Sequence, residues 1–295
     1  MRVFVTGASG HIGSAVVPEL IEAGHEVVGL ARSDASAAAV EAMGAEVRRG
    51  GLHDLDGLCR AASGADAVVH LAFDHDAMAA GRFADAVAAD LTVVRALGDT
   101  LAGTGKTLMG IGLTRTGDPA RDAAIDANPR SAVAREIAGL AERGVRTVLV
   151  AVPPVTHSGR DRIGFVPTLI RIARETGVSA YVGDGANRWP AVHTLDLGRL
   201  YRLALEKAPA GSLVHGAAEE GITVRELART IGRRLDVPAR SITAEQAATH
   251  FSAFPFITLD LAMPTADDAR RLLGWEPVQP GLLADLEEGH YFAAA

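Results

Sequence analysis

A glycine-rich turn between an apolar segment and a helical pattern is the feature that most constrains the fold of this chain. It follows the run Val3–Val5, precedes a helical pattern over Ile12–Ala23 and reads Thr6-Gly7-Ala8-Ser9-Gly10-His11-Ile12-Gly13. The first glycine permits a tight turn, the second lets backbone approach a pyrophosphate, and the third lets helix pack closely on strand. The helix N-terminus favours phosphate. We therefore expect a dinucleotide site, contacted by Gly7, Ser9, Gly10, His11, Ile12 and Gly13, rather than an ordinary turn.

Short apolar runs alternate with alanine-rich helical patterns through the first half of the chain. Their continuous apolar character indicates strands that are covered on both faces. Right-handed crossovers between them predict a doubly wound parallel (Rossmann) sheet of order 3-2-1-4-5-6, with ligands beyond the carboxyl ends of the strands. The predicted strands are Val3–Thr6, Glu26–Ala31, Glu46–Arg49, Ala67–Leu71, Thr107–Ile111 and Thr147–Val152.

Three motifs together resemble one enzyme family. They are the spacing Gly7-x-x-Gly10-x-x-Gly13, the tripeptide His70-Leu71-Ala72 after a later strand, and the stretch Trp189-Pro190-Ala191-Val192-His193-Thr194-Leu195-Asp196. The chain resembles the extended short-chain dehydrogenases/reductases, a family of NAD(P)-dependent epimerases, dehydratases and reductases. The resemblance implies a dinucleotide-binding domain over residues 1–153 and a smaller C-terminal substrate lobe over 154–295, some of whose late strands and helices return to the sheet.

Composition limits the classes of partner. The formal net charge is −7, whereas nucleic acids and anionic membranes reward clustered Lys and Arg. The single cysteine, Cys59, excludes an internal disulfide and fits a reducing compartment. No signal peptide is visible, and no apolar run reaches the roughly 18 residues that span a bilayer. We expect a soluble, cytoplasmic protein with a small-molecule substrate, and neither nucleic acid nor membrane as partner.

The end of the second predicted strand indicates which cofactor is bound. An NAD site places Asp or Glu there to bind the ribose hydroxyls, but this chain has Ala31 followed by Arg32 and Ser33. A guanidinium and a hydroxyl suit a 2′-phosphate, so we expect NADP in preference to NAD. In the alternative interpretation Arg32 stacks on adenine or faces solvent, and Asp34 reaches the ribose.

The resemblance implies further cofactor contacts through backbone. Relatives place Asp and an apolar residue beside the adenine, where this chain has Gly51-Leu52, so that the adenine is held more weakly or by another group such as Asp54. The loop with Leu71, Ala72 and Phe73 corresponds to the one under the nicotinamide ribose. The loop with Pro153 and Val155 corresponds to the one against the nicotinamide ring. The apolar neighbours of His70 favour a satisfied core histidine over a chemical role.

The catalytic residues depart from the family pattern. Relatives carry Ser or Thr after the fifth strand and a Tyr with Lys four residues later, but here Gly112 takes the serine position and Thr114 follows two residues on. The dyad window reads Asp126-x-x-x-Arg130 or Ser131-x-x-x-Arg135, and Lys follows by four residues after none of the tyrosines, Tyr181, Tyr201 and Tyr291. Residue identity therefore excludes the usual tyrosine mechanism. An arginine can hold the ribose but is no proton reservoir at neutral pH.

Other side chains are candidates for the proton donor. Thr114 can hydrogen-bond a carbonyl, His157 follows the nicotinamide-side loop, and His75 lies between Asp74 and Asp76, where flanking carboxylates favour its charged form. The alternative for Asp74–Asp76 is a polar loop end that caps a helix, and adjacent residues of this kind predict no metal site. Asp74, Tyr181 and Trp189 are candidate substrate contacts, with lobe packing as the alternative for Tyr181 and Trp189.

Three functions remain open at this point. The first is an NADP(H)-dependent oxidoreductase that acts on a small carbonyl or related substrate with a proton donor other than tyrosine. The second is a non-redox isomerase, lyase or cyclase on the same fold, and the third is a nucleotide-sensing regulatory protein. The intact glycine turn favours the first. Helical patterns at Phe83–Leu101 and Asn128–Glu142 are apolar on several faces, which permits a homodimer.

Overall fold

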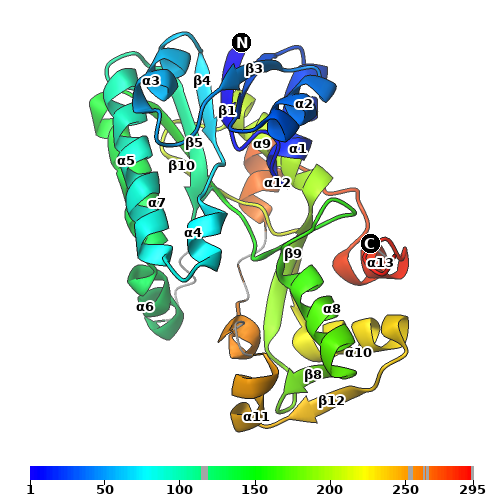
Figure 1. Ribbon diagram of the computed structural model, residues 1–295. Coiled ribbons are helices and arrows are strands. Elements are labelled where there is room, and N and C mark those ends of the chain that lie inside the picture. The colour runs from blue at the N-terminus through cyan, green and yellow to red at the C-terminus, as the bar shows by residue number, and fades with distance from the viewer. Residues whose placement is uncertain (114–118, 252–254, 262, 264–265, 294–295) are drawn as a thin grey trace. The chain divides into compact units, whose positions relative to one another are not determined.

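The computed structural model describes residues 1–113, 119–251, 255–261, 263 and 266–293. The chain divides into two compact units, each made of several segments (Figure 1). Unit 1 consists of Met1–Val152, Leu197–Gly216 and Asp267–Glu276; unit 2 consists of Pro153–Asp196, Ala217–Ala266 and Pro277–Ala295. Two late segments of the chain thus belong to the first unit. No helix among the described residues has the length and apolar character needed to cross a membrane.

Unit 1 contains a parallel sheet, which has seven strands within the described residues. The strands are β1 (Arg2–Thr6), β2 (Glu26–Ala31), β3 (Glu46–Arg49), β4 (Ala67–His70), β5 (Thr107–Gly112), β6 (Arg146–Ala151) and β10 (Ser212–His215). Their order is β10-β6-β5-β4-β1-β2-β3, which confirms the predicted doubly wound sheet and its order of six strands. The seventh strand, β10, pairs with β6, and it is a late strand of the kind that was expected to return to the sheet, although its residues were not predicted.

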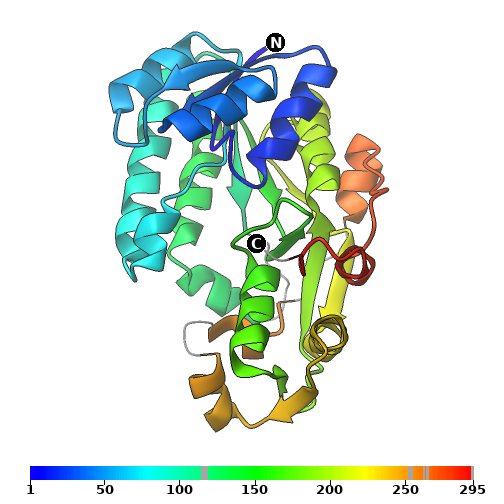
Figure 2. The ribbon, with the colours of Figure 1, turned by 45° about the vertical axis from the view of Figure 1, so that its right-hand side comes forward.

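Helices cover both faces of this sheet. In Figures 1 and 2, α3, α5 and α7 lie on one face, and α1, α2, α9 and α12 lie on the other. This is the arrangement that right-handed crossovers on either side of β1 produce. The helices are α1 (Gly13–Glu22), α2 (Asp34–Ala42), α3 (Leu55–Ser63), α4 (His75–Ala79), α5 (Phe83–Leu101), α6 (Pro119–Ala127), α7 (Arg130–Gly139), the 3-10 helix η1 (Leu140–Arg143), α9 (Thr194–Lys207, whose first turn belongs to unit 2) and α12 (Asp267–Leu273).

Unit 2 has two small sheets and its own apolar core. The strands are β7 (Val155–His157), β8 (Ser179–Val182), β9 (Arg188–His193), β11 (Glu219–Thr223) and β12 (Ala239–Ile242), in the orders β11-β9-β7 and β12-β8. The helices are α8 (Phe165–Thr176), α10 (Val224–Leu235), α11 (Ala244–His250), the 3-10 helix η2 (Pro255–Thr258) and α13 (Leu282–Glu287). Leu169, Leu227, Ile231 and Leu282 from three of these helices pack together in that core.

Candidate functional site

The turn between β1 and α1 leaves no space for side chains at Gly7 and Gly13. Gly7 has a φ of +69°, and a Cβ there would lie 2.8 Å from the Ala72 nitrogen. A Cβ on Gly13 would lie 2.1 Å from the Gly7 oxygen, so the helix can approach the strand this closely only with glycine. Gly10 donates its N–H to the Gly7 oxygen at 2.9 Å. Ser9 is exposed on the turn, and His11 and Ile12 lead into α1. The geometry fits a pyrophosphate at the N-terminus of α1.

The β1–α1 turn packs on the loop that follows β4. Leu71 and Ala72 both donate their N–H to the hydroxyl of Thr6, each at 3.2 Å. Together with the contact between Gly7 and Ala72, these bonds join the glycine turn to the loop where the sequence places the nicotinamide ribose. A cofactor on the turn would therefore extend toward the carboxyl ends of β4 and β5.

Two arginines lie at the carboxyl ends of β2 and β3. Arg32 pairs with Asp76 at 2.9 Å, and both side chains are mostly exposed. Arg49 donates to the Ser33 carbonyl at 2.7 Å and pairs with Asp34. The Ser33 hydroxyl caps α2 by accepting the Ser36 N–H at 3.2 Å. This edge of the sheet thus carries two guanidiniums, each balanced by an exposed carboxylate that a phosphate could replace.

The segment after β3 is held by its own polar contacts. Asp54 accepts the Gly57 N–H at 2.9 Å as the N-cap of α3, and it lies 3.9 Å from the Arg48 guanidinium. Leu52, the predicted adenine neighbour, packs its partly buried side chain against the core beneath α3 and α5. Asp54 is therefore already engaged with the helix N-terminus.

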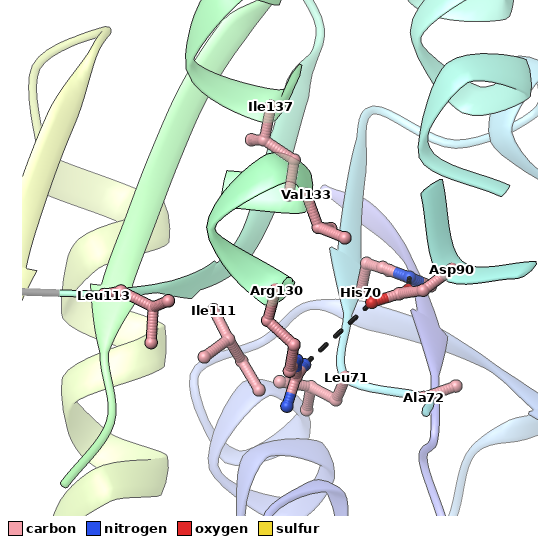
Figure 3. A pocket seen from close by; sticks show the side chains of 9 residues that line it. All are labelled: His70, Leu71, Ala72, Asp90, Ile111, Leu113, Arg130, Val133 and Ile137. Atoms are coloured by element: carbon pink, nitrogen blue, oxygen red, sulfur yellow. Dashed lines mark hydrogen bonds and ion pairs between the residues drawn. The ribbon is translucent and has the colours of Figure 1, made fainter. Parts of the chain in front are cut away.

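A pocket opens at the carboxyl ends of β4 and β5 in unit 1. Its free space in this conformation is about 20 Å³, little more than the room that one water molecule needs. Figure 3 shows the lining side chains, which are His70, Leu71, Ala72, Asp90, Ile111, Leu113, Arg130, Val133 and Ile137. Apolar walls with one charged pair are typical of a site for a small molecule.

Asp90, Arg130 and His70 form the polar part of this pocket. His70 Nε2 lies 2.8 Å from Asp90 Oδ1, and its Nδ1 lies 2.7 Å from the Thr6 hydroxyl oxygen. His70 is 4% exposed and Asp90 2% exposed. The Arg130 guanidinium lies 4.0 Å from Asp90 Oδ2 and 4.3 Å from the centre of the Phe73 ring. Burial lowers the pKa of Arg130, opposed by the charge of Asp90.

The loop from Phe73 to Asp76 begins helix α4. Asp74 is its N-cap and accepts the Ala77 N–H at 2.9 Å, a hydrogen bond that holds the pKa of Asp74 below its usual value. His75 is exposed, and its ring meets the edge of Phe73 with centroids 5.5 Å apart. The alternative interpretation of this segment, a polar loop end that caps a helix, is therefore present in the structure. The imidazole of His75 is nevertheless accessible to solvent.

His157 lies in the interior of unit 2. It is 0% exposed, its Nδ1 is 2.8 Å from Asp285 Oδ2, and its ring packs against His193 at 5.3 Å. Burial, followed by the neighbouring His157, lowers the pKa of His193. In this conformation a substrate has no access to His157. Through its contact with Asp285, this side chain connects β7 to α13.

The other sequence candidates of unit 2 pack in its core. Trp189 is 1% exposed and donates Nε1–H to the Leu259 carbonyl at 3.1 Å, and Tyr181 packs partly buried against the same core. Val155 is buried in β7, and the Pro153 carbonyl accepts a long hydrogen bond from Thr156. Lobe packing, the alternative for Tyr181 and Trp189, is what these contacts show.

A second buried carboxyl lies in the loop after β7. Asp161 accepts the Gly164 N–H at 2.8 Å and the Tyr291 hydroxyl at 3.3 Å, and Tyr291 in turn accepts the Ser158 N–H at 3.0 Å. Burial raises the pKa of Asp161 from 3.8 to about 6. The carboxyl is therefore more easily protonated in the folded protein than in the unfolded chain.

We expect Asp161→Asn to change how stability depends on pH. A raised folded pKa contributes stability that is full below the unfolded pKa of 3.8 and is lost as pH rises through about 6. The asparagine variant should lack this loss and exceed the wild type above that range by on the order of 2–3 kcal/mol. Urea unfolding across pH measures it, with the exposed Glu175→Gln as control. Parallel curves for wild type and Asp161→Asn would contradict the assignment.

Thr114 lies outside the described residues. The tyrosines offer no replacement for the missing dyad, because Tyr201 is fully buried on α9, where burial raises its pKa, and Tyr291 is engaged with Asp161. Arg130, which the sequence offers as a ribose-holding residue, lines the pocket with Asp90. Asp90 was not singled out, although its position on the buried face of α5 was a signal.

Known proteins share the sequence and fold of this chain. The sequence model of the NAD dependent epimerase/dehydratase family matches residues 3–106. Uncharacterized protein C2A9.02 of Schizosaccharomyces pombe is 41% identical over 301 residues, covering 99% of this chain and 100% of that protein. Uncharacterized protein YLL056C of Saccharomyces cerevisiae is 40% identical over 300 residues, covering 98% and 99%.

Solved structures show the same fold. A dTDP-glucose 4,6-dehydratase (DesIV) of Streptomyces venezuelae, solved with NAD and TYD bound, superposes with a TM-score of 0.74 at 21% identity, covering 98% of this chain and 96% of that one. The residues that match the family model include the glycine turn, and the order of the parallel sheet is the one expected for a dinucleotide-binding fold. The chain belongs to the NAD-dependent epimerase/dehydratase family.

Proposed function

We propose that this protein is an NADP(H)-dependent oxidoreductase that acts on a small carbonyl compound, or the corresponding alcohol, without a catalytic tyrosine. The observation that carries the proposal is the continuity of two features in unit 1. The glycine turn, which fits a pyrophosphate, packs through Gly7 on Ala72, and Ala72 lines the pocket that holds Arg130 and Asp90. A dinucleotide on the turn would thus direct its nicotinamide toward a pocket that combines apolar side chains with one charged pair.

The residues divide the work of binding. Gly7, Gly10 and Gly13 with the N-terminus of α1 would hold the pyrophosphate, Arg32 the 2′-phosphate, and the backbone of Leu71 and Ala72 the nicotinamide ribose. The contacts of Pro153 and Val155 with the nicotinamide remain proposals from the family resemblance. When bound, the nicotinamide supplies or accepts a hydride, so the protein has to orient the substrate and manage one proton.

The identity of the proton donor is the open part of this proposal. His75 is accessible beside Phe73 and is still a candidate donor, and so is Thr114. The burial of His157 favours a structural role for that residue. The apolar walls of the pocket suit a small, largely apolar carbonyl compound.

Arg32→Ala should weaken NADPH much more than NADH. Loss of a charged hydrogen bond to the 2′-phosphate corresponds to about 1.5–3 kcal/mol, roughly tenfold or more in Kd, and NADH lacks that phosphate. Titration calorimetry with both cofactors measures the difference. Arg95→Ala, an exposed arginine paired with Glu136 on another helix, is the matched control. Equal losses for the two cofactors would show that Arg32 does not recognise the 2′-phosphate.

A substrate panel tests the proposed reaction. Purified protein with NADPH should consume the reduced cofactor only when a suitable small aldehyde or ketone is added, and the alcohol product should appear in equal amount. Loss of nicotinamide absorbance and chromatography of the products measure the two quantities. Product formed from a sugar or other metabolite with no net change in NADPH, and without any response to carbonyl compounds, would favour the isomerase, lyase or cyclase function.

A further inference from the structure

The hydrogen bonds around Thr6 determine which nitrogen of His70 carries a proton. The Thr6 hydroxyl oxygen accepts the N–H of Ala72 and also that of Leu71, which it shares with the Thr6 carbonyl at the same distance of 3.2 Å. A hydroxyl has two acceptor lone pairs and one hydrogen, so its hydrogen is left for His70 Nδ1, 2.7 Å away. Nδ1 must then be the acceptor, and the proton of the neutral ring is on Nε2. His70 therefore donates Nε2–H to Asp90 Oδ1 at 2.8 Å.

This arrangement orients Asp90 with one oxygen toward the pocket. Oδ1 is occupied by His70, while Oδ2 accepts no hydrogen bond from the described part of the chain and faces Arg130 at 4.0 Å. The Arg130 guanidinium likewise donates no hydrogen bond within the described residues and rests on the Phe73 ring. Figure 3 shows the Arg130 and Asp90 side chains converging in the pocket. The Asp90 Oδ2 acceptor and the N–H donors of Arg130 thus lie side by side without a hydrogen bond between them.

A separation of 4.0 Å is too long for a hydrogen bond, and it raises the question of what lies between the two groups. The complement of one acceptor and one cationic donor is a group that both donates and accepts. A hydroxyl does this, since its hydrogen can point to Asp90 while its oxygen accepts from Arg130. A carboxylate or phosphate does not fit, because it would bring negative charge against the Asp90 oxygen.

We propose that Asp90 and Arg130 bind the reacting oxygen of the substrate, with Asp90 as the proton acceptor for its hydroxyl and Arg130 as the group that stabilises the oxyanion. The inference rests on the proposed function and supplies the proton donor that it leaves open. His70 and Thr6 are positioning residues, because they act on the substrate only through Asp90. The substrate class is an uncharged alcohol or carbonyl compound rather than an acid.

The proton balance follows from this placement. In the oxidation direction, the hydroxyl proton passes to Asp90 Oδ2, the O–H electron pair becomes the second bond of the carbonyl, and the hydrogen on carbon leaves as hydride to the nicotinamide. After the product has left, Asp90 releases the proton through the open side of the pocket that it lines, and reduction is the reverse, with a proton that enters by the same route. Arg130 keeps its charge throughout and needs only to donate a hydrogen bond to the negative oxygen.

Asp90→Asn is the first test, because asparagine can still accept from His70 through its amide oxygen. The variant should bind NADPH with a Kd within about twofold of wild type and lose about 10²–10⁴-fold in kcat. Asp99→Asn, an exposed aspartate on the same helix paired with Arg143, is the matched control and should match wild type. A raised Kd for NADPH with unchanged kcat at saturation would overturn the inference, since Asp90 would then hold the cofactor ribose.

Trifluoroethanol provides a readout that does not depend on turnover. With NADP⁺ present, fluorine NMR should show this alcohol bound to the wild type and to Asp99→Asn, with affinity at least about tenfold weaker in Asp90→Asn and in Arg130→Met. Equal binding to all four proteins would overturn the inference. Asp90-dependent binding in a protein that reduces no carbonyl compound would uphold the hydroxyl site and refute the proposed oxidoreductase function, so the two failures are distinguishable.

Discussion

Replacing Gly10 with valine should abolish NADP(H) binding while the protein stays folded. The Gly10 N–H bonds to the Gly7 oxygen, and a Cβ would lie 3.1 Å from that oxygen, a tight contact that small shifts can relieve. The two methyl groups of valine would then stand over the turn, where the pyrophosphate has to meet backbone N–H groups. We expect a loss of affinity of about hundredfold or more, close to 3 kcal/mol. Calorimetry with NADPH and circular dichroism of the free protein measure binding and folding.

Two other glycines make this result interpretable. Gly139→Val places the same side chain at an exposed helical position with nothing within 4 Å, and it should bind NADPH normally. In contrast, Gly13→Val puts a Cβ 2.1 Å from the Gly7 oxygen and should destabilise unit 1 itself. Normal NADPH affinity in folded Gly10→Val would refute the assignment of the turn as the pyrophosphate site.

His70→Leu should reduce the free energy of unfolding by about 3–5 kcal/mol, the range for leaving a buried charge without its partner. Asp90 would lose the N–H that occupies Oδ1, and at 2% exposure it has almost no access to water. Arg130 at 4.0 Å compensates only part of this loss, because it makes no hydrogen bond to the carboxylate. Urea unfolding of wild type and variant measures the difference.

A double variant separates the cost of the orphaned carboxylate from the cost of lost packing. His70→Leu combined with Asp90→Leu removes the imidazole and the buried carboxylate together, and it should recover part of the lost stability, although Arg130 then loses its counter-charge. If His70→Leu alone unfolds like the wild type, or if the double variant is less stable still, the account of this network is wrong.

The parts of the fold that could be predicted are those coded by neighbouring residues. Six strands of unit 1 were predicted within one residue at each end, because all of them except β3 are short apolar runs between turn residues. The glycine turn was predicted because the φ of Gly7 and the close contact at Gly13 permit hardly any other residue. Local sequence therefore determined the positions of the strands and of the nucleotide turn, and the rule of right-handed crossovers then determined the sheet order.

Strand β10 shows what local pattern misses. Its four residues, Ser212–His215, are too few for a periodic signal, and their partner β6 lies more than sixty positions earlier in the chain. Only the completed sheet, with an open edge at β6, specifies where this segment pairs. The small strands of unit 2 are similar, since each is short and pairs across intervening helices.

The pocket residues were the hardest to predict, because they converge from separate elements. Asp90 comes from α5, Arg130 from α7, and His70 from β4. One signal was present, since Val87, Asp90 and Val94 share a face at helical spacing, and a carboxylate on an apolar face requires a partner. The sequence does not say that the partner is His70. Residue type alone also does not distinguish the accessible imidazole of His75 from the buried one of His157.

The most direct test of the central claim follows hydride from labelled cofactor. NADPH carrying deuterium at the transferring position of C4 is incubated with the protein and a carbonyl compound that supports cofactor consumption, and the product is analysed by mass spectrometry and NMR. The account predicts one deuterium on the carbon that bore the carbonyl, in an amount equal to the alcohol formed, with a proton from solvent on the oxygen. Product that carries no deuterium, or that forms at the same rate without nucleotide, would contradict it.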